Sequence, residues 1–173
     1  ITTSGSQTYT NLVTLTGLTR LIGTTGTLSG GVAGGGNSLQ LSFSAPTSLS
    51  GGTFSNINAL TVDGGSTTTL NGTFTTTGTQ QYDDQVLLGG ITALSAPAIV
   101  FGNTVGTAGN DLTLTTDALS VSGPGSISGG GALTYQPRVA ATPLRGVALT
   151  TARGAWLPAV YRIRRIVPPT MST

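Results

Sequence analysis

The sequence repeats itself at an offset of 73 residues. The run Gly5-Ser6-Gln7-Thr8-Tyr9 recurs as Gly78-Thr79-Gln80-Gln81-Tyr82, so that Gly5 matches Gly78, 73 positions later. Matched pairs at this offset continue from Thr2 to Thr134. Two copies of one unit are typical of repeat architectures, in which neighbouring units stack and bury a shared core.

Within each unit, apolar and polar residues alternate with the period of a half-buried strand. The pairs Val13/Leu15, Leu39/Leu41 and Leu60/Val62 alternate with Thr, Gln or Ser. Between such segments lie turn-forming runs: Gly34-Gly35-Gly36-Asn37, Asp63-Gly64-Gly65, Asn71-Gly72 and Gly129-Gly130-Gly131. Strands of about five residues in coils of about 20 predict three or four turns of a β-solenoid per unit. We therefore expect an all-β fold with a solenoid over residues 1–137.

The composition excludes much enzyme chemistry. The chain has no His, Cys, Lys or Glu, and only 7% of its residues are charged. Histidine-based triads, cysteine nucleophiles, lysine Schiff bases, His or Cys zinc sites and disulfides are therefore excluded. No apolar run reaches the roughly 18 residues of a membrane-spanning helix. The chain opens at Ile1 without a basic and apolar leader, and we expect an internal or processed piece.

Four segments carry a further signal: Gly5 to Leu15, Thr67 to Gly72, Ala108 to Leu114, and Gly131 to Thr134. Together they resemble the repeat region of bacterial exoproteins of the filamentous haemagglutinin type. The resemblance covers about residues 2 to 137. It implies a right-handed parallel β-helix, export through a two-partner secretion transporter, and a role as an adhesin or its shaft. It also implies an extracellular or cell-surface location, with glycans or proteins of host or neighbouring cells as partners.

From Arg138 onward the sequence changes character. Residues 138–173 hold six of the seven arginines and none of the five aspartates, and the 73-residue offset stops. Three interpretations remain open for this basic tail. It is a cap on the last coil, a basic interaction arm, or a chance extension of the reading frame. The sequence thus divides into a solenoid of two repeats over 1–137 and an irregular tail over 138–173.

Asp83 and Asp84 are the only adjacent carboxylates, and some β-helix enzymes cleave polysaccharides with clustered acids. Neighbouring residues of a strand point to opposite faces, so the two carboxylates could converge only in a turn. The other repeat carries Thr10-Asn11 at this place, which favours a solvated turn. The remaining acids are Asp63, Asp111 and Asp117.

Gly109-Asn110-Asp111-Leu112 partly matches the calcium-binding nonapeptide of other solenoids. Its counterpart Gly36-Asn37-Ser38-Leu39 lacks the carboxylate, so a turn held by local Asn and Asp hydrogen bonds is the favoured interpretation.

Threonines at alternate positions raise one more possibility, a hydroxyl ladder of the kind that binds ice: Thr14 and Thr16, Thr73 and Thr75, Thr113 and Thr115. The simpler interpretation is the outward face of strands, where β-branched residues are favoured. Asn71-Gly72-Thr73 matches a glycosylation sequon, but Asn-Gly is first a turn signal.

Together these observations predict a non-enzymatic structural or adhesive segment of a bacterial surface exoprotein. No residue is assigned to catalysis, to a cofactor or to a metal, and neither nucleic acid nor a membrane span is expected. The alternatives are a polysaccharide-active or glycan-binding β-helix and, less favoured, an ice-binding solenoid.

Overall fold

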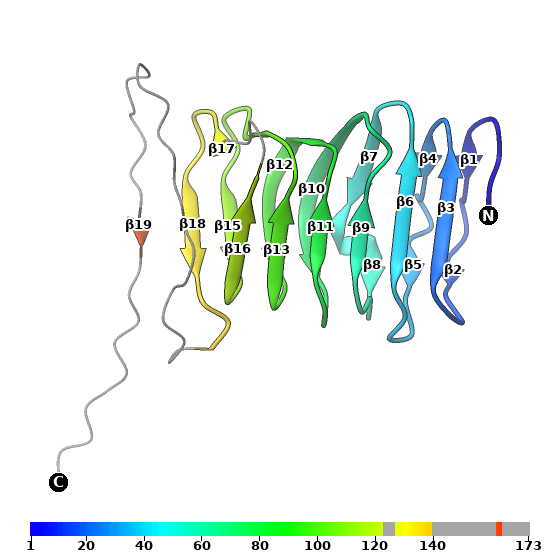
Figure 1. Ribbon diagram of the computed structural model, residues 1–173, viewed down its shortest axis with the longest axis horizontal. Helices are drawn as coiled ribbons and strands as arrows, with labels where there is room; N and C mark the ends of the chain where they lie inside the picture. The colour runs from blue at the N-terminus through cyan, green and yellow to red at the C-terminus, as the bar shows by residue number, and fades with distance from the viewer. Residues whose placement is uncertain (123–126, 140–161, 164–173) are drawn as a thin grey trace, which may run out of the picture.

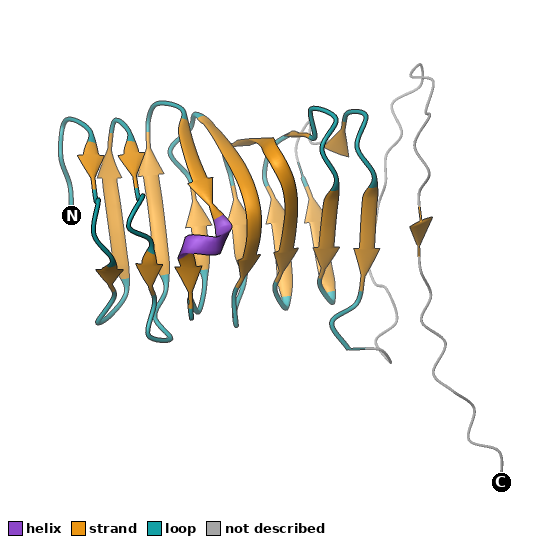
Figure 2. Ribbon diagram, turned by 180° about the vertical axis from the view of Figure 1, so that it is seen from behind, coloured by secondary structure: helices purple, strands orange, loops and turns teal. Residues whose placement is uncertain are grey.

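The chain forms a parallel β-solenoid of about six turns, as the sequence predicts. The computed structural model describes residues 1–122, 127–139 and 162–163. Its strands stack along one axis from the N-terminal coil to β18 (Figure 1). The one helix among these residues is the short 3₁₀ turn η1 (Gly51–Thr53), purple in Figure 2.

Each coil contributes strands to three faces of the solenoid. Face 1 is one six-stranded sheet: β3 (Thr19–Gly23), β6 (Leu39–Phe43), β9 (Leu60–Val62), β11 (Gln80–Tyr82), β13 (Ala98–Phe101) and β16 (Ala118–Val121). Face 2 holds β1 (Gln7–Thr8), β4 (Gly26–Thr27), β7 (Thr47–Ser50), the first parts of β10 (Thr67–Thr75) and β12 (Gln85–Ser95), β14 (Val105–Gly106) and β17 (Ile127–Ser128). Face 3 holds β2 (Val13–Thr14), β5 (Val32–Ala33), β8 (Phe54–Ser55), the second parts of β10 and β12, β15 (Leu112–Thr115), β18 (Leu133–Gln136) and β19 (Arg162–Ile163).

Strands of successive coils pair in parallel register. From β1 to β18, paired residues lie between 18 positions apart, as for Thr67 and Gln85, and 22 positions apart, as for Val105 and Ile127. Parallel pairing of this kind brings equivalent residues of neighbouring coils directly above one another. The coil length of about 20 residues expected from the sequence is therefore confirmed.

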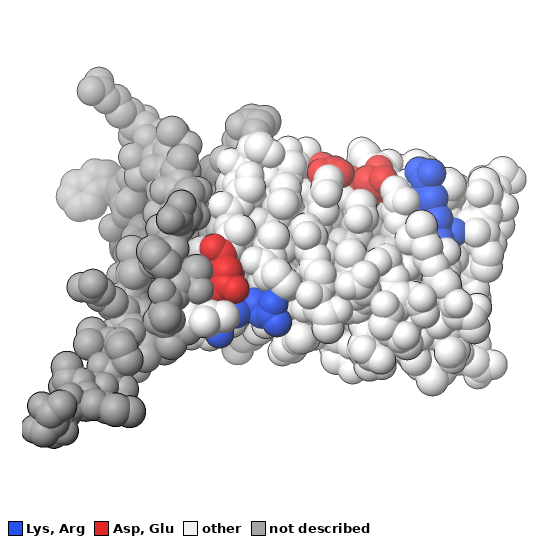
Figure 3. Space-filling view, turned by 60° about the horizontal axis from the view of Figure 1, so that its bottom comes forward, with Lys and Arg blue, Asp and Glu red and all other residues white. Residues whose placement is uncertain are grey.

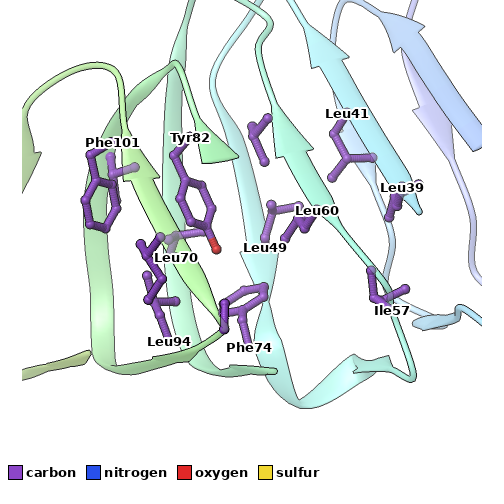
Figure 4. Packing of buried hydrophobic residues seen from close by; sticks show 14 of the residues in the cluster. Leu39, Leu41, Leu49, Ile57, Leu60, Leu70, Phe74, Tyr82, Leu94 and Phe101 are labelled. Carbon is purple, nitrogen blue, oxygen red and sulfur yellow. The ribbon is translucent and has the colours of Figure 1, made fainter. Parts of the chain in front are cut away.

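The core consists of columns of side chains that continue from coil to coil. On face 1 one column runs from Leu21 to Phe101 through these register-matched residues: Leu21, Leu41, Val62, Tyr82 and Phe101. All five are at most 3% exposed, and several of them appear in Figure 4. The rings of Tyr82 and Phe101 stack with their centroids 5.6 Å apart. Burying one such side chain contributes roughly 1.5–3 kcal/mol, so a continuous column of five contributes substantially to stability.

The two sequence repeats adopt the same local structure. Asn37 Nδ2 donates to Leu15 O over 3.1 Å, and its counterpart Asn110 Nδ2 donates to Leu88 O over 3.0 Å. Gly36 and its counterpart Gly109 both have positive φ, at 81° and 85°. The sequence repeat is therefore also a repeat of backbone conformation and hydrogen bonding.

The second repeat is nevertheless turned by one face relative to the first. Strands β3, β6 and β9 form a ladder on face 1, whereas their counterparts in β12, β15 and β18 form a ladder on face 3. The cause is the unit length, since 73 residues span about three and two-thirds coils of this size. Corresponding outer surfaces of the two units therefore lie on adjacent sides of the solenoid.

One predicted turn lies inside a strand. Asn71-Gly72 belongs to β10, where the register with β12 shifts between Leu70 and Gly72. Gly72 has a φ of 87°, a conformation that favours glycine, and it lies at the corner where β10 passes from face 2 to face 3. The need for a glycine at this position is confirmed, whereas the expected break between two strands is wrong because β10 continues through it.

Ala108 allows a direct test of this turn geometry. Its φ is 52°, a left-handed conformation that its counterpart Gly35 adopts at 57°. We expect Ala108→Gly to raise the free energy of unfolding by up to about 1 kcal/mol, because an L-residue is strained there. Gly109→Ala, at a φ of 85° and with open space around its Cβ, should lower it by about 1 kcal/mol. Urea unfolding measures both.

Gly17→Ala is the matched control for these turn variants, because its Cβ also meets open space and its φ is not positive. It should change stability by less than about 1 kcal/mol. A loss for Gly17→Ala equal to that for Gly109→Ala would contradict the assignment of strain to the turn.

Only part of the basic tail falls within the described residues. β19 pairs in parallel with β18, Thr134 lying opposite Arg162. The amides of Arg138 and Val139 donate to Asp117 Oδ1 at 2.9 and 3.2 Å. The three interpretations of residues 138–173 otherwise concern segments that lie outside the described residues.

Candidate functional surface

The two adjacent carboxylates do not converge. Asp83 is exposed and accepts two hydrogen bonds from Gln81 Nε2, at 3.1 and 2.9 Å. Asp84 is only 3% exposed and lies on the inner side of the chain. The period-2 argument from the sequence is confirmed, and this pair does not provide the two facing acids that glycoside hydrolysis requires.

Asp84 corrects the expectation that both acids lie in a solvated turn. Its Oδ1 accepts from the Gly65 amide at 2.6 Å, and its Oδ2 accepts from Thr68 Oγ1 at 3.1 Å. Both donors belong to the preceding coil. The carboxylate therefore replaces backbone pairing at a corner, which a buried acid can do when donors surround it.

The other aspartates also join neighbouring coils. Asp63 accepts from Gln40 Nε2 and, at 2.7 Å, from Ser42 Oγ. Asp111 is exposed and accepts from the Ala132 amide at 2.9 Å. These contacts occupy the carboxylates in holding one coil to the next.

A turn forms at Asn110-Asp111 as the sequence predicts, and its local bond is the one from the Asn110 backbone amide to Thr107 O at 2.8 Å. The expected local side-chain bonds are corrected, because Asn110 Nδ2 donates to Leu88 O on the preceding coil and Asp111 accepts from the Ala132 amide on the next coil. Among the described residues, no three His, Cys, Asp or Glu side chains come together as a metal site requires.

A buried polar network in the core was not singled out from the sequence. Gln80 is 0% exposed, and its Nε2 donates to Phe74 O at 3.0 Å and to Ser95 O at 3.2 Å. Its Oε1 accepts from Tyr82 Oη at 3.1 Å, and burial raises the pKa of Tyr82 far above its usual value. Gln7 and Tyr9 repeat the same contact at 2.9 Å. The recurrence of Gln-x-Tyr in both units was the signal available in the sequence.

The outer surface of face 3 carries two columns of mostly hydroxyl side chains. In register, one column is Thr73, Ala93, Thr113 and Thr134, and the other is Thr75, Ser95, Thr115 and Gln136. Thr14 also lies on face 3, in β2. Ala93 and Gln136 interrupt the hydroxyls, as the incomplete Thr-x-Thr pattern predicts, and ice binding stays a prediction.

Charged groups occupy little of the surface. In the view of Figure 3, acidic and basic atoms form two small areas, and the remainder of the visible described surface is uncharged. A surface of this composition can form many weak hydrogen bonds through hydroxyls and amides. It offers little long-range attraction to a charged partner.

Within the part of the chain that the structure describes, no helix has the length and hydropathy needed to cross a bilayer. Comparison with protein-family models, with curated proteins and with solved structures returned no match. The structure supports the β-solenoid fold that the resemblance to filamentous haemagglutinin-type repeats implies, and the comparisons identify no family.

Proposed function

We propose that the chain is a non-enzymatic structural and adhesive segment of an exported bacterial surface protein. The observation that carries the proposal is the uninterrupted parallel register from β3 to β16 on face 1. Every inner coil of this ladder bonds to the coil before and after it, an arrangement typical of a stiff rod with a continuous core. The resemblance of the repeats to bacterial exoproteins supports the surface location.

The adhesive part of the proposal rests on face 3. Its two outer columns present hydroxyl groups in rows that only Ala93 and Gln136 interrupt, with coils about 4.8 Å apart in parallel sheets. β-branched side chains hold few rotamers, so little entropy is lost when a partner orders them. Single contacts of this kind are weak, and many in parallel give attachment by avidity. Glycans of neighbouring cells have the matching hydroxyl chemistry.

Beads coated with the chain and passed under flow over cultured epithelial cells test this function. We expect retention that falls after enzymatic removal of cell-surface glycans. Thr113→Asp, in the centre of face 3, should lower retention by roughly tenfold at low coating density. Thr61→Asp, an outward threonine on face 1, is the matched control and should leave retention unchanged. Retention no better than that of uncoated beads would refute the adhesive function.

A further inference from the structure

The first coil has a side that no described strand covers. β1 pairs with β4 alone, and β2 pairs with β5 alone. The first residues of the chain lie over the β3 part of this coil, where Thr2 forms an isolated parallel bridge to Ile22 and the Ile22 amide donates to Ile1 O. The edges of β1 and β2 that point away from β4 and β5 therefore present backbone groups that inner strands of the solenoid use for pairing.

The second repeat shows what covers an edge of this kind. Its corresponding strands are β11 and the first part of β12, and they are covered by β9 and β10. Three amides outside the ladders donate to that covering coil: Gly78 to Asn58 O at 2.7 Å, Asp83 to Val62 O at 2.8 Å and Gln85 to Ser66 O at 3.3 Å. The corresponding amides of the first repeat are those of Gly5, Thr10 and Leu12.

Burial differs between the two repeats at the same positions. Tyr82 and Val86 are at most 1% exposed beneath the covering coil. Their counterparts Tyr9 and Val13 are only partly buried, although both pack against the core. Leu12 is 60% exposed. The uncovered side of the first coil is therefore apolar in its inner part and open to solvent.

The first residues of the chain already take the place of the end of such a covering coil. The bridge between Thr2 and Ile22 matches the pairing of Thr75 with Ser95. The Thr3 amide donates to Ile22 O at 2.9 Å, as the Thr76 amide donates to Ser95 O at 3.0 Å. The register for one more coil is thus set by contacts that exist in the structure.

We propose that the uncovered side of the first coil is a docking site for one further coil of this same repeat. The occupant has the pattern of residues 57–73, in which Leu60, Val62 and Leu70 point inward. Its strands pair with β1 and β2 in the registers that β9 and β10 use with β11 and β12. The end of the solenoid is therefore extendable by its own unit. This proposal is independent of the adhesive function.

The test adds a copy of residues 57–73 directly before Ile1 of the full chain, so that Ile1 takes the place of Phe74. A control extension carries Leu60→Ser, Val62→Ser and Leu70→Ser within the added copy. Hydrogen exchange is then measured at the amides of Gly5, Thr10 and Leu12, and denaturant unfolding is followed by circular dichroism. We expect the apolar extension to slow exchange at these amides by at least about tenfold and to raise the unfolding midpoint. With the serine extension, exchange at these three amides should remain as fast as in the original chain.

Equal exchange rates in the two extended chains would overturn the proposal, because an apolar coil would then add no specific cover. Protection that increases with protein concentration, with a matching dimer in sedimentation, would also overturn it. That result would show that a second copy covers the edge in place of a coil on the same chain.

Discussion

Replacing Gln80 by alanine is expected to lower the free energy of unfolding by about 4 kcal/mol. The side chain is completely buried and bonds to Phe74 O, Ser95 O and Tyr82 Oη. Its loss leaves those buried groups short of a partner and opens a cavity between coils. Urea unfolding followed by circular dichroism measures the change.

Gln7→Ala is the matched control, since Gln7 makes the same contact with Tyr9 and also bonds to Ile22 O. Tyr9 is only partly buried, so water can replace the lost bonds. We expect a loss of about 1 kcal/mol or less. Equal losses in the free energy of unfolding for the two variants would contradict the prediction, because the deeper burial of the Gln80 network would then add nothing to stability.

Gly64→Ala is the second variant with a large expected effect, a loss of about 3 kcal/mol or more. A Cβ at Gly64 would overlap the backbone carbonyl of Phe43 on the preceding coil. The turn cannot move away without weakening the bonds from the Asp63 amide to Leu41 O and from the Gly65 amide to Asp84. Denaturant unfolding gives the magnitude, and loss of the β signal in circular dichroism would mark the extreme case.

Two glycines separate this close approach from other effects of adding a methyl group. Gly65 has a φ of 79° but open space around its Cβ, so Gly65→Ala should cost about 1 kcal/mol. Gly52 has open space and no positive φ, and Gly52→Ala should be nearly neutral. A Gly64→Ala protein as stable as Gly52→Ala would mean that the two coils approach less closely than the structure shows.

The sequence predicts the solenoid because stacking places similar residues in similar surroundings. Alternation at Leu39/Leu41 and Leu60/Val62 identifies inward positions that are buried in β6 and β9. The offset of 73 residues correctly predicts matched turns, such as those that hold Asn37 and Asn110. Local pattern and turn chemistry agree here with the tertiary fold, which is the condition for such reasoning to succeed.

The features that the sequence analysis missed depend on contacts between coils. Asp84 looks like a surface acid in the sequence, yet donors on the preceding coil make its burial possible. Gln80 is buried because two carbonyls and Tyr82 meet at one point inside the solenoid. Neither set of partners can be identified until the register between coils is known, and a one-residue change of register would reverse inside and outside.

The turn of one face between repeats has a consequence for how the molecule would meet a flat partner. Because each unit places its pattern on the next side, the outward residues that the two units share climb the axis as a spiral. A longer array built on the same unit would return to its starting side only at every third unit. A set of outward residues encoded once in the unit would then be presented on all three faces. Attachment to a flat surface would therefore not depend on the rotation of the solenoid about its long axis.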